Sequence, residues 1–349
     1  MKKIATKISL VLICCSCLTV LIITGISIFK GTQLIQRDTQ EKIQWMAKEY
    51  STSLSSEFEE VEDDVKEMEN HVRATIDVYR LKDEPDYLPQ YEKELEEYMY
   101  NFAMKNTDGK SAWCYFNPEL SDSPHDVFYI DENNDKQPER QPYIPFSYFD
   151  NTPTPTDDKQ WWYGAIKSKD GYWTNPYKWT LSNGQIIRPC SYARAIYING
   201  ELIAVVGTYY SFDDIVKQLE RVKIYQNGYL AIYNDEMGVV SNPNYYAGTR
   251  FTSDNLEKVN DGKYKKIAYE MQHNNDGIIN EKIAGDNILI AYSKMSNGWI
   301  MTVNPKYNEI FSDMNIMVAE LLVGGIACIV FTVAIAVWLG KRFAAPILT

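Results

Sequence analysis

The residues best suited to bind another molecule are aromatic, and they gather in one stretch of the chain. Between residues 160 and 210 lie Trp161, Trp162, Tyr163, Tyr172, Trp173, Tyr177, Trp179, Tyr192, Tyr197, Tyr209 and Tyr210, with Arg188 and Arg194 among them. Aromatic rings provide flat apolar walls, hydroxyl or indole donors, and faces that attract cations. Any single one of them could belong to an aromatic core. As a group, on the loops expected between strands, they predict a pocket for a small, partly polar ligand.

Signatures of catalysis and of metal binding are missing from the sequence. No nucleophile elbow, phosphate-binding Gly loop or H-x-x-x-H spacing occurs, and the only histidines are His71, His125 and His273. Asp131, Asn133 and Asp135 resemble the start of a calcium loop. Lys136 stands where that loop needs Gly and Pro142 where it needs a bidentate Glu, which favours an acidic surface turn. We therefore predict no catalytic residue, no metal and no cofactor.

The overall composition and charge limit the classes of protein to consider. The chain has 349 residues, of which 45% are hydrophobic and 23% charged, as in ordinary globular proteins. Its 47 acidic and 35 basic residues give a formal net charge of -12. Nucleic-acid binding requires a basic surface, so a nucleic-acid partner is not expected.

Two apolar runs at opposite ends of the chain predict membrane spans. Residues 8–29 carry no charge, and a helix of this length covers about 33 Å, enough to cross a hydrocarbon core of about 30 Å. The run is longer than the apolar part of a cleaved signal peptide, which favours a permanent anchor over that alternative. A second span is expected at residues 316–339. Glu320 lies at its entrance, as an interfacial residue or as a functional intramembrane carboxylate.

Basic residues outside both runs predict the topology. Lys2, Lys3 and Lys7 precede the first run, and Lys341 and Arg342 follow the second. Because Lys and Arg accumulate on the cytoplasmic side, both termini (1–7 and 340–349) are expected there, with residues 30–315 outside the cytoplasm. Of the six cysteines, only Cys114 and Cys190 then lie outside the membrane, either as one disulfide or as two buried thiols.

The outer region begins with helices and continues with strands. Residues 31–105 read as stalk helices, because apolar residues recur every three or four positions at Tyr50, Leu54, Phe58, Val61, Val65, Met68, Val72 and Ile76. A Pro-containing break near Asp83 separates a second helix that ends near Met104. Later segments alternate as strands, and Asn199-Gly200 predicts a tight hairpin. The expected fold class is α+β, with one long helix and two successive antiparallel sheets, the second smaller.

Several short motifs, in this order, resemble the double Cache sensor domain of bacterial receptors. The distal half is marked by Trp162-Tyr163, Trp173-x-x-Pro176-Tyr177, Ser191-Tyr192 and Val205-Val206-Gly207, and the proximal half by Asn227-Gly228-Tyr229, Gly238, Asn242-Pro243 and Asn297-Gly298-Trp299. The resemblance implies two PAS-like modules on the stalk helix, at residues 106–222 (membrane-distal) and 223–310 (membrane-proximal). It also implies a small-molecule ligand in the distal module.

This sequence departs from the family's pattern at three positions. Gln160 replaces an Arg before the Trp-Tyr pair, and Tyr209 replaces the Asp that receives the ammonium group of an amino acid; in the proximal half, Asn242 replaces a His. A ligand less cationic than an amino acid, or one that places its cation against aromatic faces, is therefore expected. The predicted ligand-facing residues are Trp162, Tyr163, Trp173, Tyr177, Tyr192, Arg194 and Tyr209.

The sequence as a whole predicts the sensory half of a two-pass transmembrane receptor. Residues 340–349, with Arg342-Phe-Ala-Ala-Pro346-Ile347, resemble the opening of a HAMP linker, so a cytoplasmic effector is expected to follow. The expected partners are a small-molecule ligand, the membrane and a second copy of the chain in a homodimer. The alternatives are a membrane-anchored exported enzyme, or an adhesion protein that uses the aromatic cluster as an interface.

Overall fold

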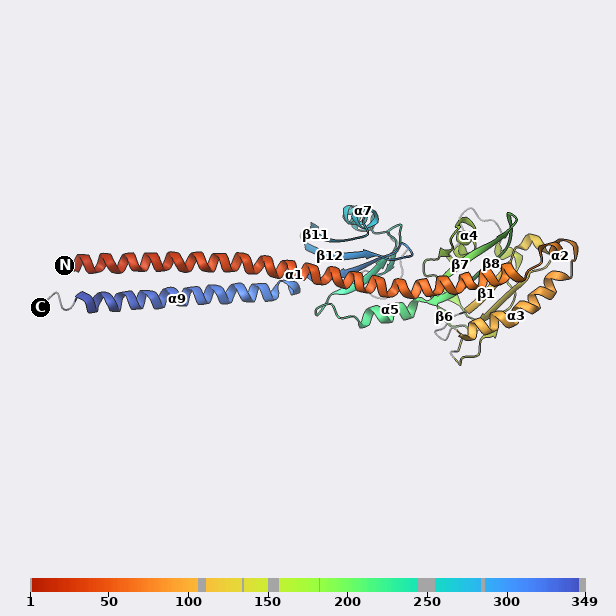
Figure 1. Cartoon of the computed structure of the whole chain (residues 1–349), viewed down its shortest axis with the longest axis horizontal. Coiled ribbons are helices and arrows are strands. Elements are labelled where there is room, and N and C mark those ends of the chain that lie inside the picture. The colour runs from red at the N-terminus through yellow and green to blue at the C-terminus, as the bar shows by residue number, and fades with distance from the viewer. Residues whose placement is uncertain are drawn as a thin grey trace.

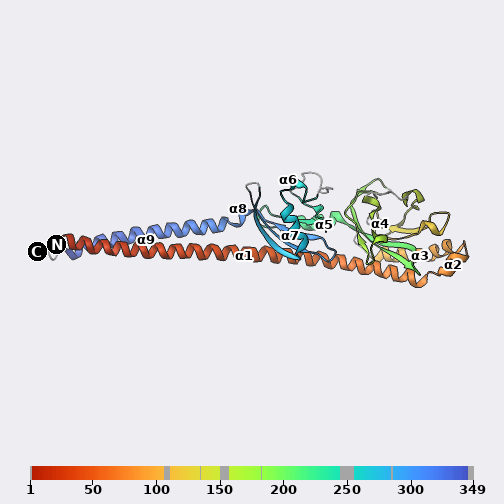
Figure 2. The same ribbon diagram turned by 90° about the horizontal axis from the view of Figure 1, so that it is seen from above.

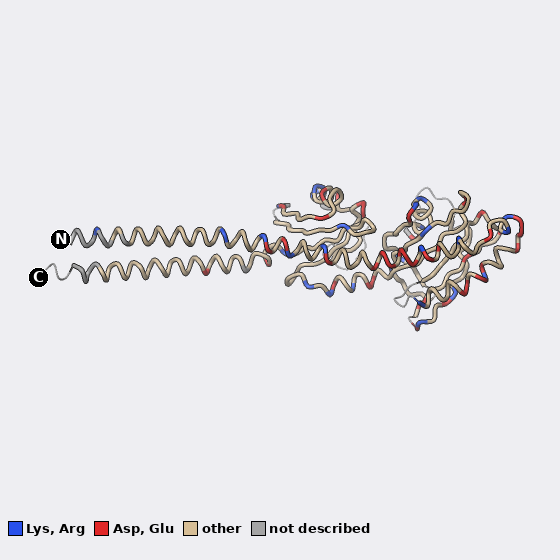
Figure 3. Tube along the Cα trace, in the orientation of Figure 1, with Lys and Arg blue, Asp and Glu red and all other residues tan. Residues whose placement is uncertain are grey.

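The structure is a computed structural model, and it describes residues 2–105, 111–133, 135–149, 157–181, 183–243, 255–283 and 286–344. Two long helices lie side by side at the end that holds both termini, and two α/β modules follow each other along the same axis (Figures 1 and 2). We call the module nearer the termini proximal and the farther one distal. Where they are drawn in colour, the two helices at the terminal end carry few charged residues, whereas acidic residues are frequent along the modules (Figure 3).

Helix α1 (Lys2–Thr75) joins the apolar N-terminal run to both modules without a break. Its apolar stripe is buried as predicted, with Phe58, Val65 and Val72 fully covered, while Glu59 and Glu60 are exposed on the opposite side. The predicted boundary between the membrane span and the outer region, near residue 30, therefore does not coincide with the end of a helix. Helix α9 (Ser312–Ala344) packs beside the first part of α1. Both α1 and α9 contain segments long and apolar enough to span a membrane.

Two shorter helices complete the stalk region. α2 (Val78–Asp83) begins at Asp77, whose carboxylate accepts the backbone N–H groups of Tyr79 and Arg80. After the predicted break near Asp83, α3 (Tyr87–Lys105) runs back along the distal sheet. Residues 31–105 thus belong to three helices, α1, α2 and α3, apart from the short breaks between them.

The distal sheet has six antiparallel strands in the order β3-β2-β1-β8-β7-β4. The strands are β1 (Ser111–Phe116), β2 (Asp126–Ile130), β3 (Glu139–Arg140), β4 (Tyr172–Trp173), β7 (Pro189–Ile198) and β8 (Glu201–Ser211). The predicted hairpin joins β7 to β8, with Asn199 and Gly200 both at positive φ (53° and 85°). Helices α1 and α3 pack on one face of the sheet. α4 (Gln160–Lys167) lies over β7, and β5 (Trp179–Thr180) and β6 (Ile186–Ile187) form a separate small ribbon.

The proximal sheet has five antiparallel strands in the order β10-β9-β13-β12-β11, so the second sheet is the smaller one, as predicted. Helix α5 (Phe212–Arg221) connects it to the distal module. Its elements are β9 (Tyr229–Tyr233), β10 (Val239–Ser241), α6 (Val259–Gly262), α7 (Lys265–His273), β11 (Asp276–Ile283), β12 (Asp286–Lys294), β13 (Ile300–Asn304) and α8 (Tyr307–Ile310). The α+β fold class is therefore confirmed.

The largest apolar cluster runs along α1 through both modules. Phe58 joins them, because its ring lies 4.5 Å from Trp173 and 5.6 Å from Trp299 between ring centroids. Cys114 and Cys190 are fully buried in this cluster as two free thiols, which decides between the two alternatives that the sequence left open. Burial raises the pKa of the Cys190 thiol to about 12.

Candidate functional site

A cavity of about 120 Å³ lies in the distal module, on the sheet face opposite α1. Its lining is mostly aromatic and consists of Trp113, Tyr115, Phe128, Ile144, Tyr148, Asp158, Trp161, Tyr177, Trp179, Ser191 and Tyr209. Two short 3-10 helices, η2 (Phe146–Phe149) and η3 (Asp157–Lys159), contribute residues from outside the sheet. An apolar cavity of about 150 Å³ binds benzene, so this cavity suits a ligand of about six non-hydrogen atoms.

Strand periodicity and the start of α4 place the aromatic walls. Trp113 and Tyr115 alternate along β1 and therefore share a face of the sheet. The ring of Trp161, from the first turn of α4, lies 4.7 Å from Trp113 and 4.8 Å from Tyr115 between centroids. On the other side, Trp179 stands edge-on to Tyr209 at 6.0 Å. The rings form an aromatic box over the central strands.

A few polar groups point into this box. The Tyr177 and Ser191 hydroxyls share a hydrogen bond of 2.9 Å, and the Trp161 indole N–H donates to the Tyr148 hydroxyl at 3.3 Å. Within the described residues, the Tyr209 hydroxyl makes no hydrogen bond. Burial raises the pKa of the Tyr177, Tyr148 and Tyr209 phenols, which therefore remain neutral donors. Of the described lining residues, Asp158 alone has a formal charge.

The structure separates the seven predicted ligand-facing residues into three groups. Tyr177 and Tyr209 line the cavity. Trp162 and Tyr163 lie beside it on α4, rather than on a loop: the Trp162 ring packs 4.7 Å from Phe149, and the Tyr163 hydroxyl donates to the Phe149 carbonyl at 2.9 Å. The remaining three, Trp173, Tyr192 and Arg194, lie on the other face of the sheet.

The third group, Trp173, Tyr192 and Arg194, connects the distal sheet to α1. The Trp173 indole donates to the Glu62 carboxylate at 2.7 Å, and Arg194 forms an ion pair with Glu69. Tyr192 and Arg194 do share a sheet face, as predicted, and their side chains are 3.3 Å apart. Because α1 covers that face, these residues connect the distal sheet to the helix. Burial raises the pKa of Glu62.

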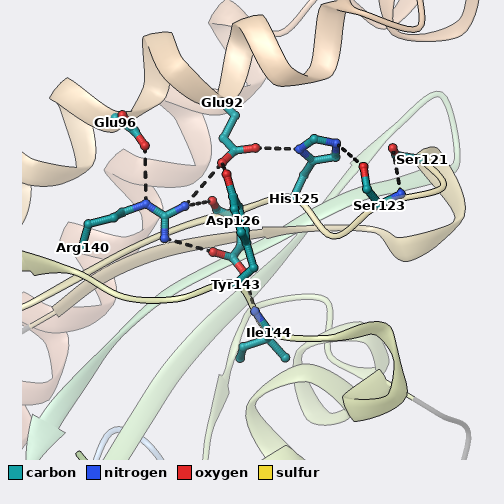
Figure 4. A network of polar contacts seen from close by, with 9 residues as sticks. All are labelled: Glu92, Glu96, Ser121, Ser123, His125, Asp126, Arg140, Tyr143 and Ile144. Atoms are coloured by element: carbon teal, nitrogen blue, oxygen red, sulfur yellow. Dashed lines mark hydrogen bonds and ion pairs between the residues drawn. The ribbon is translucent and has the colours of Figure 1, made fainter. Parts of the chain in front are cut away.

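A buried polar network supports one wall of the cavity (Figure 4). Its first centre is Glu92 on α3, which is only 5% exposed. One carboxylate oxygen of Glu92 lies 2.6 Å from His125 Nδ1, and the other accepts the Tyr143 hydroxyl at 2.5 Å and Arg140 Nη2 at 3.3 Å. Glu96 of α3 approaches the same guanidinium at 3.5 Å. The network therefore ties α3 to the edge of the distal sheet.

Its second centre is Asp126, which is 1% exposed at the start of β2. Its Oδ1 accepts Arg140 Nη1 at 3.2 Å, and its Oδ2 accepts the backbone N–H of Ile144 at 2.9 Å. Ile144 lines the cavity, so the Asp126 carboxylate holds that wall in place. Burial raises the pKa of Asp126 to about 6, despite the neighbouring guanidinium.

This shift predicts that acidification stabilises the distal module. Asp126 binds its proton more tightly in the folded chain, so its favourable contribution is complete below pH 3.8 and is lost as pH rises through about 6. Between pH 7 and pH 5 the wild type should gain about 1 kcal/mol relative to Asp126→Asn, or about 2–4 °C in Tm. Thermal unfolding of the full chain in lipid nanodiscs, at both pH values, measures this difference. Equal gains in the two proteins would contradict the prediction.

The described residues contain no group of three His, Cys, Asp or Glu that could hold a metal ion. Asp131 and Asn133 instead accept the backbone N–H of Asp135, and Asp131 also accepts that of Lys136, which has a positive φ of 64°. This is the acidic turn expected from the sequence.

Residues 95–217 match the family model of the methyl-accepting chemotaxis protein-like, first PDC sensor domain. The distal module is a PDC sensor domain. All described residues that line the cavity fall within the matched range, so the cavity belongs to this sensor domain. The family model describes a sensor domain rather than a catalytic one. No curated protein sequence matches the chain.

Solved sensor domains share the fold of both modules. The periplasmic sensory domain of the Campylobacter jejuni chemoreceptor Tlp1 has a TM-score of 0.61 at 15% identity, over 79% of this chain and 98% of that one. A structure described as methyl-accepting chemotaxis protein X has a TM-score of 0.55 at 13% identity, over 77% and 98%. The ligand-binding domain of the Pseudomonas fluorescens chemoreceptor CtaA, in complex with L-isoleucine, has a TM-score of 0.53 at 13% identity, over 81% and 99%.

Proposed function

We propose that this chain is the sensory part of a two-pass transmembrane receptor, and that its PDC sensor domain binds a small organic cation. The aromatic cavity, with Asp158 as its one acidic lining residue among those described, carries the proposal. Both termini would lie in the cytoplasm, since Lys2, Lys3 and Lys7 precede the first apolar run and basic residues follow the second. Two such chains would form a homodimer.

The charge and size of the cavity support a cationic ligand. The described lining residues provide one carboxylate, that of Asp158, and no Lys or Arg. An amino acid presents both an ammonium and a carboxylate group, and only the first has a counter-charge here. Trp and Tyr faces attract cations, and aromatic boxes suit quaternary ammonium groups. A small amine or ammonium ion without a carboxylate therefore fits better than the L-isoleucine bound by CtaA.

A basic neighbour modulates this preference. Lys159 follows Asp158 directly, and its Nζ lies 5.0 Å from the centroid of the Tyr148 ring, which lines the cavity. This ammonium group occupies a position over the aromatic wall and opposes the entry of a second cation. Asp158 and Lys159 should therefore act on the affinity for a cation in opposite directions.

Signal transmission would use the contacts between the distal sheet and α1. Ligand binding over β7 and β8 would shift the Trp173–Glu62 and Arg194–Glu69 contacts on the opposite face of the sheet. α1 continues into the membrane segment, so the shift would reach the cytoplasm through one continuous helix. A ligand transmits only the difference between its affinities for the two signalling states, typically about 1–3 kcal/mol.

The cytoplasmic output would follow the second span. Helix α9 continues through residues 340–344, where the sequence resembles the opening of a HAMP linker; Pro346 and Ile347 lie outside the described residues. We propose that this segment leads to an effector beyond residue 349.

Titration with tetramethylammonium tests the proposed ligand class. We expect saturable binding to the full chain in nanodiscs, detected by calorimetry and by the fluorescence of the cavity tryptophans. Asp158→Asn should weaken binding about tenfold, because the counter-charge is lost, and Lys159→Met should strengthen it about threefold.

Neutral tert-butanol, of similar size, serves as the control ligand, and it should bind at least tenfold more weakly. Equal affinity of the two ligands, or an Asp158→Asn variant that binds like the wild type, would refute the cationic ligand.

A further inference from the structure

The proximal module contains a second cavity, of about 400 Å³, between its sheet and α7. Tyr229 and Tyr233 of β9 and Thr302 and Asn304 of β13 line it from the sheet. This sheet face is the one opposite α1, just as in the distal module. By comparison with a benzene-binding cavity of about 150 Å³, the volume suits a ligand of about ten to sixteen non-hydrogen atoms.

Polar side chains are buried in this cavity where a simple core would be apolar. Thr302 is fully buried, and Asn242 and Asn304 are 4% and 8% exposed. The Asn242 amide donates to the Tyr233 hydroxyl at 3.0 Å, and the Asn304 amide donates to the Thr302 hydroxyl at 2.8 Å. An amide nitrogen has two N–H donors, so the Asn304 side chain can also donate to a carboxylate in the cavity.

Charge indicates which polar group this ligand carries. Lys306, the residue directly before α8, is the only described lining residue with a formal charge. It forms no ion pair with a described residue. The pKa of Glu309 is lowered by the hydrogen bond from the Asn227 side chain and, to a smaller extent, by the charge of Lys306. The opposite wall is apolar, with Ile267 and Met271 of α7 both nearly fully buried. A ligand with a carboxylate near Lys306 and an apolar body against α7 would complement the charge of Lys306 and the apolar surface of α7.

We propose that the proximal module is a second binding site, for a small carboxylic acid with an apolar body. It is distinct from the cation site of the distal module in place, size and charge. Lys306 directly precedes α8 and Tyr307 is its first residue; both line the cavity, and α8 is followed by the apolar helix α9 (Figure 2). The carboxylate would therefore act on α9 over a few residues, whereas the distal ligand acts through α1.

Calorimetric titration of the full chain in nanodiscs, with empty nanodiscs as background, tests this site. The probes are 3-phenylpropionate, 4-phenylbutyrate and octanoate, with 3-phenylpropanamide as the uncharged control. We expect saturable binding of at least one carboxylate and at least tenfold weaker binding of the amide. Lys306→Met should weaken carboxylate binding at least tenfold, while Lys282→Met, an exposed change on β11, should leave it unchanged.

Asn304→Leu provides a second measurement. It removes the buried polar groups of this side chain, so it should abolish carboxylate binding while the chain without ligand retains or gains thermal stability. The proposal fails if none of the three carboxylates binds saturably, or if Lys306→Met and Lys282→Met bind them equally. Binding of tetramethylammonium to the distal module is measured in a separate titration. A failure of the proposed distal ligand can therefore be distinguished from a failure of the proximal carboxylate site.

Discussion

Replacement of Phe58 by Ala is expected to destabilise both modules at once, by about 3–5 kcal/mol. Phe58 is fully buried on α1, and its ring contacts Trp173 of the distal module, Tyr210 at the end of β8, and Trp299 of the proximal module. Removal of the ring leaves a cavity where both sheets meet the helix. Both the transfer free energy and the loss of packing contribute to this cost.

Hydrogen exchange of the full chain in nanodiscs distinguishes this effect from a local one. In Phe58→Ala, the protected amides of β8 and of β13 should both exchange at least 100-fold faster, because the free energy needed to open either module is lower. Two fully buried α1 residues serve as matched controls: Ile43, near the proximal contacts, and Met68, near the distal ones. Ile43→Ala should accelerate β13 alone, and Met68→Ala should accelerate β8 alone. If Phe58→Ala affects only one module, the modules do not depend on this shared contact.

Elements with strong local patterns could be predicted from the sequence. The apolar stripe of α1 repeats with the helical period over many turns, so its buried face is defined before any tertiary contact is known. Asn199-Gly200 likewise determines a hairpin, because both positions accept positive φ. By contrast, strand β11 was not predicted from the sequence. Its sequence, Asp276–Ile283, includes charged residues suited to an edge strand, and these obscure the usual alternation.

The site was predicted less completely, because local patterns do not indicate which face a helix will cover. Alternation along β7 places Tyr192 and Arg194 together, but the docking of α1 decides that this face is the helix-bearing one. Alternation along β1 could have indicated that Trp113 and Tyr115 share a face, before their partners were known. Asp158 lies in a short 3-10 turn with no periodic signal, and its place in the cavity depends on tertiary structure.

Trp161 and Trp162 show how one helical step separates two adjacent residues. Successive side chains on a helix point about 100° apart, so only one of them can enter the aromatic box. Trp161 packs between Trp113 and Tyr115 and lines the cavity, whereas Trp162 packs against Phe149 beside it. The family resemblance selects Trp162 as ligand-facing, and the geometry selects Trp161. Both are 5% exposed, which makes them a matched pair.

Trp161→Leu should therefore weaken tetramethylammonium binding about 30-fold, because a desolvated cation–aromatic contact contributes about 2 kcal/mol. Trp162→Leu should change the affinity less than threefold, although the two variants should lose similar thermal stability. Calorimetry with the full chain in nanodiscs measures the affinities, and thermal unfolding measures the stabilities. If Trp162→Leu reduces the affinity more than Trp161→Leu, the resemblance identifies the binding ring correctly, and the ligand occupies the space beside Phe149 rather than the cavity that Trp161 lines.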